Sequence, residues 1–250
     1  MKNRNAFLLL AVAILQWIAP RLPALGLGKT QGFRATADGI PPELPPGIFF
    51  SIWGVIFLAY TGFALLAVFR PSYLTERLTG PLIIAGAGNV AWMVCAQLLG
   101  NDWLNALILL PILIFSWEAS HRLHRMGGWD GTGERFLAGL VSGLLSGWLV
   151  VALSISLPEL VRDIRGLGVS DQVWVSLWIT LITAGLLAWV YRTQVSRGWW
   201  FYVALAWGLS GVVLNNWTRL DLHWLAFIAA CAGAYIIGSR IASGARPSFE

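Results

Sequence analysis

The stretch Gly47-Ile-Phe-Phe-Ser-Ile-Trp-Gly-Val-Ile-Phe-Leu-Ala-Tyr-Thr-Gly-Phe-Ala-Leu-Leu-Ala-Val-Phe69 decides the fold, because it is long, apolar and without a charged residue. A helix needs about 20 mostly apolar residues to cross about 30 Å of hydrocarbon at a rise of about 1.5 Å per residue. Within hydrocarbon each backbone amide must find its partner inside its own segment, which a helix achieves. We therefore expect a membrane-spanning α-helix here.

Similar apolar runs fill the rest of the chain. Hydrophobic residues make up 57% of the sequence and charged residues 12%, about half the charge of an ordinary soluble domain. The sequence predicts an all-α, polytopic membrane bundle of about eight helices, over Ala6–Leu25, Gly47–Phe69, Gly80–Leu99, Trp103–Ser120, Phe136–Leu157, Val173–Tyr191, Trp199–Asn215 and Leu222–Ile241.

The first of these segments has two interpretations. Its basic start, Lys2 and Arg4, and its apolar core are also typical of a cleaved signal peptide. Pro20 and Pro23 interrupt it as a span. We favour a retained helix, because no small-x-small cleavage site follows.

The positive-inside rule indicates an orientation. Most Lys and Arg residues fall on one side of the predicted spans when the N-terminus is cytoplasmic, and an even number of spans then places both termini in the cytoplasm. The net charge is +5, but the basic residues are scattered over loops, so we expect a lipid bilayer and no nucleic acid as partner. Cys95 and Cys231 lie inside apolar spans and are expected to be small core residues.

The predicted outer loop, Gly26–Pro46, ends Ile40-Pro-Pro-Glu-Leu-Pro-Pro46. These prolines stiffen the backbone and forbid a helix until the next span begins. The loop is either a rigid spacer or a lid over the outer mouth of the bundle.

Tryptophan occurs 15 times, and most of these residues fit the interfacial belt of a membrane protein. The belt accounts for Trp103, Trp117, Trp129, Trp174, Trp199, Trp200, Trp217 and Trp224. It does not account for Trp53, Trp92 and Trp148, which the helical rise places roughly 10 to 14 Å below the outer surface. Asn89, one turn from Trp92, is expected close to the same depth. These four residues either pack between helices or line a pocket for a large flat ligand.

Three motifs resemble the tryptophan-rich sensory protein family, TspO/MBR, in its longer bacterial branch. Pro45-Pro-Gly-Ile-Phe-Phe-Ser-Ile-Trp-Gly-Val-Ile-Phe57 resembles the start of that family's second helix. Asn89-Val-Ala-Trp92 matches the Asn-x-x-Trp of the third helix, and Trp148-Leu-Val-Val-Ala152 resembles the fifth. The chain departs from the family in the fifth helix, where Ser156 stands in place of an Asn, and Leu144 and Leu145 in place of Pro-Tyr.

The resemblance covers roughly residues 1–157, a five-helix unit, and leaves residues 158–250 as a three-helix membrane extension. It implies a bacterial inner-membrane protein that can form a homodimer. Such a protein is expected to bind tetrapyrroles such as protoporphyrin below the loop that follows the first helix. The predicted ligand-binding residues are Pro45, Pro46, Phe49, Phe50, Trp53, Asn89, Trp92 and Trp148.

We expect no catalytic residue, no metal site and no covalent cofactor. Glu118, His121 and His124 could face one another on a helix, but the neighbouring Arg122 and Arg125 oppose a cation. No charged residue is expected in the middle of a span, which argues against an ion-driven carrier and leaves sensing or facilitated passage. The alternatives are an enzyme that degrades the bound pigment and a structural or assembly protein without a small ligand.

Two series of small residues at four-residue spacing predict close helix contacts, within one chain or between two. They are Gly139, Gly143 and Gly147, and Ala226, Ala230, Ala234 and Gly238.

Overall fold

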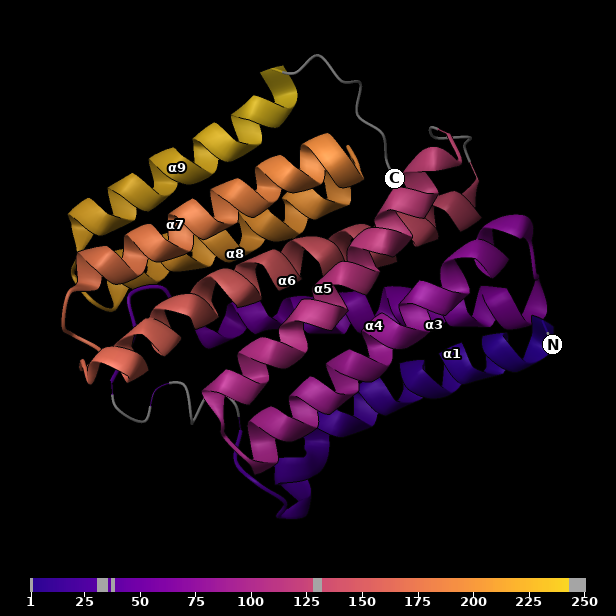
Figure 1. Ribbon diagram of the computed structural model, residues 1–250, viewed down its shortest axis with the longest axis horizontal. Helices are drawn as coiled ribbons and strands as arrows, with labels where there is room; N and C mark the ends of the chain where they lie inside the picture. Colours follow the sequence, from indigo (N-terminus) through magenta and orange to yellow (C-terminus); the bar gives the residue numbers. More distant parts are fainter. Residues whose placement is uncertain (1, 31–35, 37–38, 128–131, 243–250) are drawn as a thin grey trace.

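The computed structural model describes residues 2–30, 36, 39–127 and 132–242, and these form an all-helical bundle (Figure 1). The elements are α1 (Lys2–Ile18), η1 (Ala19–Leu25), η2 (Gly47–Ser51), α3 (Ile52–Phe69), α4 (Tyr73–Leu98), α5 (Asp102–Arg125), α6 (Gly133–Arg165), α7 (Val173–Val190), η3 (Tyr191–Val195), α8 (Trp199–Thr218) and α9 (His223–Ala242). The predicted fold class is therefore confirmed.

Seven helices of the described residues are long and apolar enough to cross a membrane. The exception among the predicted spans is α8, which is 20 residues long but less hydropathic. Its sequence carries no charge, and Asn215 and Asn216 at its end lower the mean hydropathy. Because α8 packs between α6 and α9, it needs less lipid-facing apolar surface than its neighbours.

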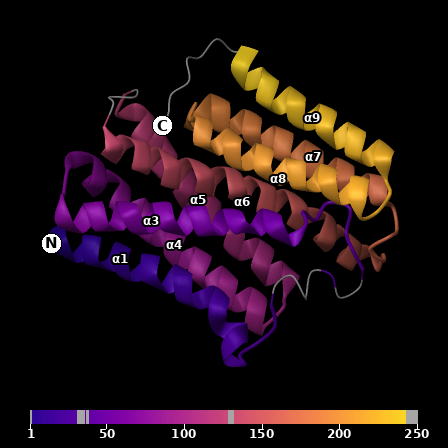
Figure 2. The same cartoon turned by 180° about the vertical axis from the view of Figure 1, so that it is seen from behind.

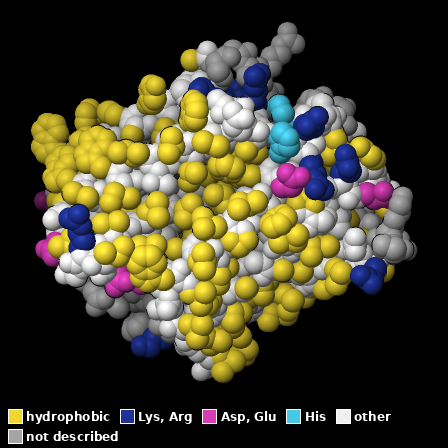
Figure 3. All heavy atoms as spheres, in the orientation of Figure 1, with side chains coloured by type: hydrophobic (Ala, Val, Ile, Leu, Met, Phe, Trp, Pro, Cys, Tyr) yellow, Lys and Arg dark blue, Asp and Glu magenta, His cyan; other side chains and the backbone are white. Residues whose placement is uncertain are grey.

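The surface fits a bilayer. On the face drawn in Figure 3, hydrophobic side chains cover the middle of the molecule and the charged side chains gather toward its two ends. Large apolar side chains in mid-helix are exposed, among them Leu58, Ile114 and Ile182. In water such a surface would be a docking or aggregation site, whereas here it faces lipid. The chain is therefore an integral membrane protein.

The first segment is part of the bundle. Helix α1 packs against α3 and α4, and its Leu9, Ala13 and Gln16 are fully buried. The chain passes Pro20 and Pro23 as the 3₁₀ helix η1, because proline keeps a helical φ but removes the amide donor.

Two predicted boundaries are wrong, for local reasons. Helix α4 begins at Tyr73 and not at Gly80, because Ser72 caps it: its hydroxyl accepts from the Thr75 amide at 3.1 Å and its amide donates to the Thr75 hydroxyl at 2.8 Å. Helix α6 does not stop at Leu157, but continues through Pro158 to Arg165. One proline costs a single backbone hydrogen bond, and the packed helix tolerates that loss. Glu159 and Arg162 therefore belong to α6. The same helix crosses the predicted domain boundary at residue 157, and the division into two units stays a prediction.

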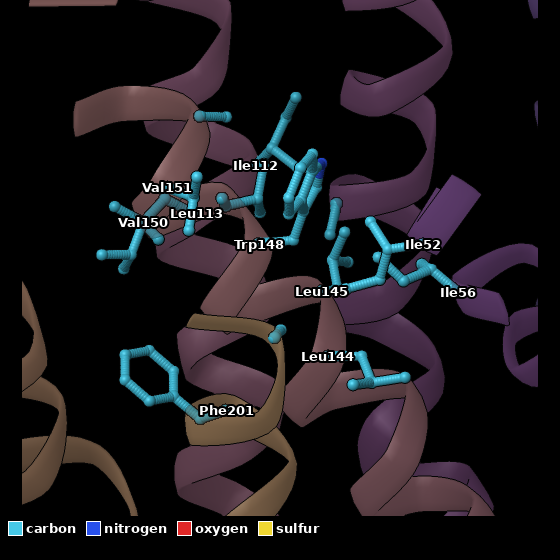
Figure 4. Packing of buried hydrophobic residues seen from close by; sticks show 14 of the residues in the cluster. Ile52, Ile56, Ile112, Leu113, Leu144, Leu145, Trp148, Val150, Val151 and Phe201 are labelled. Atoms are coloured by element: carbon cyan, nitrogen blue, oxygen red, sulfur yellow. The ribbon is translucent and has the colours of Figure 1, made fainter. Parts of the chain in front are cut away.

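Helix α6 is the centre of the molecule. It contacts α3, α5, α7 and α8, and Figure 2 shows it between a group formed by α1, α3, α4 and α5 and a group formed by α7, α8 and α9. Figure 4 shows the resulting core, in which side chains of α3, α5, α6 and α8 converge, among them Ile52, Ile112, Trp148 and Phe201.

The small residues of α6 serve contacts within the chain. A Cβ on Gly147 would lie 2.2 Å from the carbonyl oxygen of Phe201 in α8, and a Cβ on Gly143 would lie 2.7 Å from Cβ of Trp200. Glycine is therefore what lets α6 and α8 approach so closely. In α9, by contrast, Ala230 and Ala234 are exposed.

We predict that Gly147→Ala destabilises the protein by roughly 1–3 kcal/mol, because the new methyl group meets backbone and forces α6 and α8 apart. Gly80→Ala is the matched control, since its Cβ would meet nothing within 4 Å in the described residues, and alanine favours the helix. Thermal unfolding of the purified protein in detergent measures both. Equal melting temperatures for the two variants would contradict the contact.

Candidate functional site

A cavity of about 480 Å³ lies at the end of the bundle where the loop before α3 meets α6 and α8. This volume falls within the range of about 300–1,000 Å³ that small-molecule sites occupy. Aromatic side chains form its inner wall, the proline-rich loop forms one side, and polar side chains form its other end. The described lining residues are Thr36, Pro41, Glu43, Leu44, Pro45, Gly47, Phe50, Trp53, Trp92, Trp148, Ala152, Ile155, Ser156, Glu159, Arg162 and Arg219.

The aromatic wall is built around Trp53. Its ring centroid lies 6.0 Å from that of Trp92 and 6.3 Å from that of Trp148, so indoles from α3, α4 and α6 meet at one place. Phe50 lies edge-on to Trp148 at 5.5 Å. Trp148 and Trp92 are buried, and Trp53 is half-buried. Nε1 of Trp92 is buried and has no hydrogen-bond partner among the described residues, so the wall offers its flat faces to the cavity.

A second hollow of about 400 Å³ lies behind this wall. It shares Phe50, Trp53 and Trp92 with the first cavity and is otherwise lined from the side of α1 and η1, for example by Trp17 and Pro20. The shared aromatic rings therefore separate two neighbouring hollows.

Five of the eight predicted ligand-binding residues line the first cavity, namely Pro45, Phe50, Trp53, Trp92 and Trp148. The other three lie elsewhere among the described residues.

Asn89 is fully buried and its Nδ2 donates to Oε1 of Gln16 at 2.9 Å, joining α1 to α4. An amide in hydrocarbon needs such a partner, and here another helix supplies it. Gln16, like Asn89, is a polar residue within an apolar segment. The depth of the two amides in their spans is the feature of the sequence that could have paired them.

Phe49 points away from the cavity, because successive residues of a helical turn face different directions. Its ring lies 4.8 Å from that of Trp207, and its carbonyl oxygen accepts from Nε1 of Trp207 at 2.7 Å. Pro46 precedes η2, and its carbonyl accepts from the Phe49 amide at 2.9 Å.

The proline-rich loop is held against α8 by two amides. Nδ2 of Asn215 donates to the carbonyl of Pro41 at 2.9 Å, and Nδ2 of Asn216 donates to the carbonyl of Pro42 at 2.6 Å. A Cβ on Gly211 would lie 2.6 Å from Cβ of Pro45, so a glycine is needed for this approach. The loop is thus a fixed wall of the cavity over its described part, while residues 31–35 and 37–38 lie outside the described residues.

A buried ion pair fastens the same loop to α6. Oε1 of Glu43 lies 2.6 Å from Nη2 of Arg162, and the two side chains are only 2% and 8% exposed. Nη1 of Arg162 donates to the hydroxyl of Ser176 in α7 at 2.9 Å. Burial raises the pKa of the Glu43 carboxyl above its usual range, and the guanidinium of Arg162 opposes this shift. The feature of the sequence that could have indicated this pair is Glu43 itself, a glutamate with prolines on both sides.

The polar end contains one more acid. Glu159 lies one helical turn before Arg162 and also lines the cavity. Among the residues that the structure describes, the buried Oε2 of Glu43 has no hydrogen-bond partner. The cavity therefore combines an apolar, aromatic inner wall with an end that carries two carboxylates and two guanidinium groups.

The histidine motif at the opposite end is used differently. Oε1 of Glu118 binds Nε of Arg122 at 2.7 Å, and Nδ1 of His121 lies 3.2 Å from the carbonyl oxygen of Val195. The described residues contain no group of three metal-ligating side chains. Trp129 of the predicted belt lies outside the described residues.

We predict that Arg162→Met destabilises the protein by about 3–5 kcal/mol, because it leaves the Glu43 carboxylate buried without its partner. The double variant Glu43→Leu with Arg162→Met should recover part of that loss, since it removes the unpaired charge. Thermal unfolding of the double variant and of the two single variants, Arg162→Met and Glu43→Leu, checks this. A double variant that loses the sum of the two single effects would show that the side chains act independently.

The sequence pattern of the TSPO-like protein family matches residues 5–239, which extend from α1 into α9 and include Trp53, Trp92 and Trp148. No curated protein and no solved structure matches the chain. Because the matched region covers nearly all of the bundle, this chain belongs to the TSPO-like protein family.

Proposed function

We propose that this membrane protein reversibly binds a planar hydrophobic ligand, of the tetrapyrrole class, in the cavity around Trp53. The observation that carries the proposal is the meeting of Trp53, Trp92 and Trp148, from three separate helices, on one cavity of about 480 Å³. An indole has a flat, polarizable face but almost no proton chemistry, so this wall is suited to stacking on a ligand.

The energetics are adequate for such a ligand. An aromatic pair contributes about 0.5–1.5 kcal/mol beyond the burial of its area. Each apolar side chain that a ligand covers adds about 25 cal/mol per Å² removed from water. A few stacked rings with a buried apolar body are therefore sufficient for micromolar affinity, which corresponds to about 8 kcal/mol.

The same arrangement favours passive binding over driven transport. The charged groups of the cavity lie at its polar end, where Glu43 already neutralises Arg162. A carrier coupled to protons or sodium needs ionisable groups that change partners within the membrane. We therefore assign the cavity to sensing the ligand or to its facilitated passage.

We predict that Trp53→Phe and Trp148→Phe each weaken protoporphyrin binding by about 3- to 10-fold, because each removes part of a stacking surface. A titration of the protein in lipid nanodiscs measures this, with the shift of the porphyrin absorbance band as the readout. Trp224→Phe is the control, since that side chain is 76% exposed and lines none of the cavities described above.

Two outcomes would contradict the proposal. One is the absence of saturable binding by the unaltered protein. The other is a loss of porphyrin absorbance in light that Trp53→Phe abolishes, because that result would indicate chemical breakdown of the pigment and not reversible binding.

A further inference from the structure

We propose that the groove between α7 and α9 binds one anionic phospholipid, with an acyl chain along the groove and the phosphate group on Arg192 and Arg197. This site lies at the end of the bundle opposite the cavity around Trp53. Arg192 follows just after the last residue of α7, whereas Ser176, near the first residue of α7, is bonded to Arg162 of the cavity. The inference therefore does not rest on the proposed function.

The apolar part of the site is a hollow of about 270 Å³ between α7 and α9, which Figure 1 shows side by side. From Trp178 to Arg192, which both line it, the chain rises about 21 Å. One leaflet of the hydrocarbon core is about 15 Å deep, so the groove runs through a whole leaflet. Side chains at helical spacing form its two walls, namely Trp178, Ile182 and Trp189 on α7, and Tyr235, Ile236 and Ser239 on α9.

This groove is open toward the lipid. Ile182, Trp189 and Tyr235 at its rim are exposed, while Tyr202 of α8, which also lines it, is buried. An unfilled hollow loses the dispersion contacts of its lining. A hydrocarbon chain is the partner that a bilayer supplies for such a surface.

The polar part of the site begins at Arg192. This residue lines the groove and also a second hollow of about 420 Å³, which Arg197 lines as well. Nη1 of Arg192 donates to the carbonyl oxygen of Ser239 at 2.9 Å, and its other N–H groups donate to none of the described residues. The side chain of Arg197 is exposed and forms no hydrogen bond or ion pair within the described part of the chain. Two guanidinium groups thus keep donors for a ligand.

The charge around these donors is positive. Among the described residues, no aspartate or glutamate lines either hollow, and the nearby Glu118 of α5 is bound to Arg122 at 2.7 Å. The charges of Arg192 and Arg197 both act on the buried Arg240, which donates to the carbonyl oxygen of Arg197 at 2.6 Å. A phosphate group is the partner that suits such guanidinium groups, because it accepts their paired N–H donors.

The continuity of the two hollows favours a lipid over a soluble phosphate. A soluble phosphate needs only the polar hollow, whereas Arg192 joins that hollow to a groove that has the length of an acyl chain. Basic pockets between membrane helices are typical sites for anionic headgroups. A zwitterionic phospholipid brings its own ammonium group toward the arginines, so we expect it to bind more weakly.

Native mass spectrometry of the delipidated protein in detergent tests the site. The probes are dioleoyl phosphatidylglycerol and dioleoyl phosphatidylcholine, which share their acyl chains and differ in charge. We expect one tightly bound phosphatidylglycerol per chain, with an affinity about tenfold above that of phosphatidylcholine. Equal affinities for the two lipids would overturn the proposal.

The variant Arg197→Gln tests the polar part. It should weaken phosphatidylglycerol about fivefold and leave phosphatidylcholine and the melting temperature unchanged, because the side chain has no partner to lose within the described residues. Arg125→Gln is the matched control, since Arg125 is exposed at the same end of the bundle and lines neither hollow. Equal effects of the two variants would show a diffuse attraction and contradict a site.

The variant Gly185→Leu tests the apolar part. A Cβ on Gly185, which lines the groove, would lie 3.7 Å from Cδ1 of Ile236, an ordinary contact, so a leucine there has to extend into the groove. It should weaken both lipids several-fold. Gly80→Leu is the control, because a Cβ on Gly80 meets nothing within 4 Å in the described residues and Gly80 lines neither hollow. The melting temperatures show that both variants are folded.

Two further results would overturn the proposal. The first is displacement of phosphatidylglycerol by glycerol phosphate at equal concentration, which would assign the arginines to a soluble phosphate. The second is a dimer that dissociates in Gly185→Leu, because a second copy of the chain would then cover the groove. If Gly185→Leu does not fold, the comparison of the two lipids and the pair Arg197→Gln and Arg125→Gln still decide the matter.

Discussion

The ion pair between Glu43 and Arg162 is the interaction on which the cavity depends. Removing a carboxylate and a guanidinium from water costs several kcal/mol for each ion, and here a direct contact of 2.6 Å and a hydrogen bond to Ser176 offset that cost. The pair joins the loop before α3 to α6 and, through Ser176, to α7. The proline-rich loop is thereby fixed as a wall, and a ligand does not have to order it on binding, which lowers the entropic cost of association.

Helix α6 makes this arrangement possible because it is both central and long. Gly143 and Gly147 bring its backbone against α8, whose Asn215 and Asn216 hold the other side of the loop. Trp148 follows Gly147 directly and forms part of the aromatic wall. Helix α6 thus carries three features. They are the close contact that positions α8, one indole of the cavity wall and, farther along, residues of the polar end of the cavity.

The membrane fold was predictable because hydropathy and length act locally: each apolar run must become a helix whatever its neighbours do. Position along each span follows from the same length rule, and Trp53, Trp92 and Trp148 line one cavity. Helix ends were less predictable. Helix α4 begins where the side chain of Ser72 caps it, and α6 continues past Pro158 because its packing tolerates the proline. The direction of a side chain around its helix was the least predictable, since it depends on which helices become neighbours.

By itself, the sequence determined that this protein is a membrane bundle of helices with several indoles at one level, because the bilayer imposes both length and apolarity on every span. Only the tertiary structure decided how the polar residues are paired. The side chain of Asn89 is hydrogen-bonded to Gln16, and the carbonyl oxygen of Phe49 accepts from Trp207. The carboxylate of Glu43 binds Arg162, which lies 119 residues away along the chain. The physical reason is that a buried polar group takes its partner from whatever helix packs beside it, and that neighbour is set by the packing of the whole bundle.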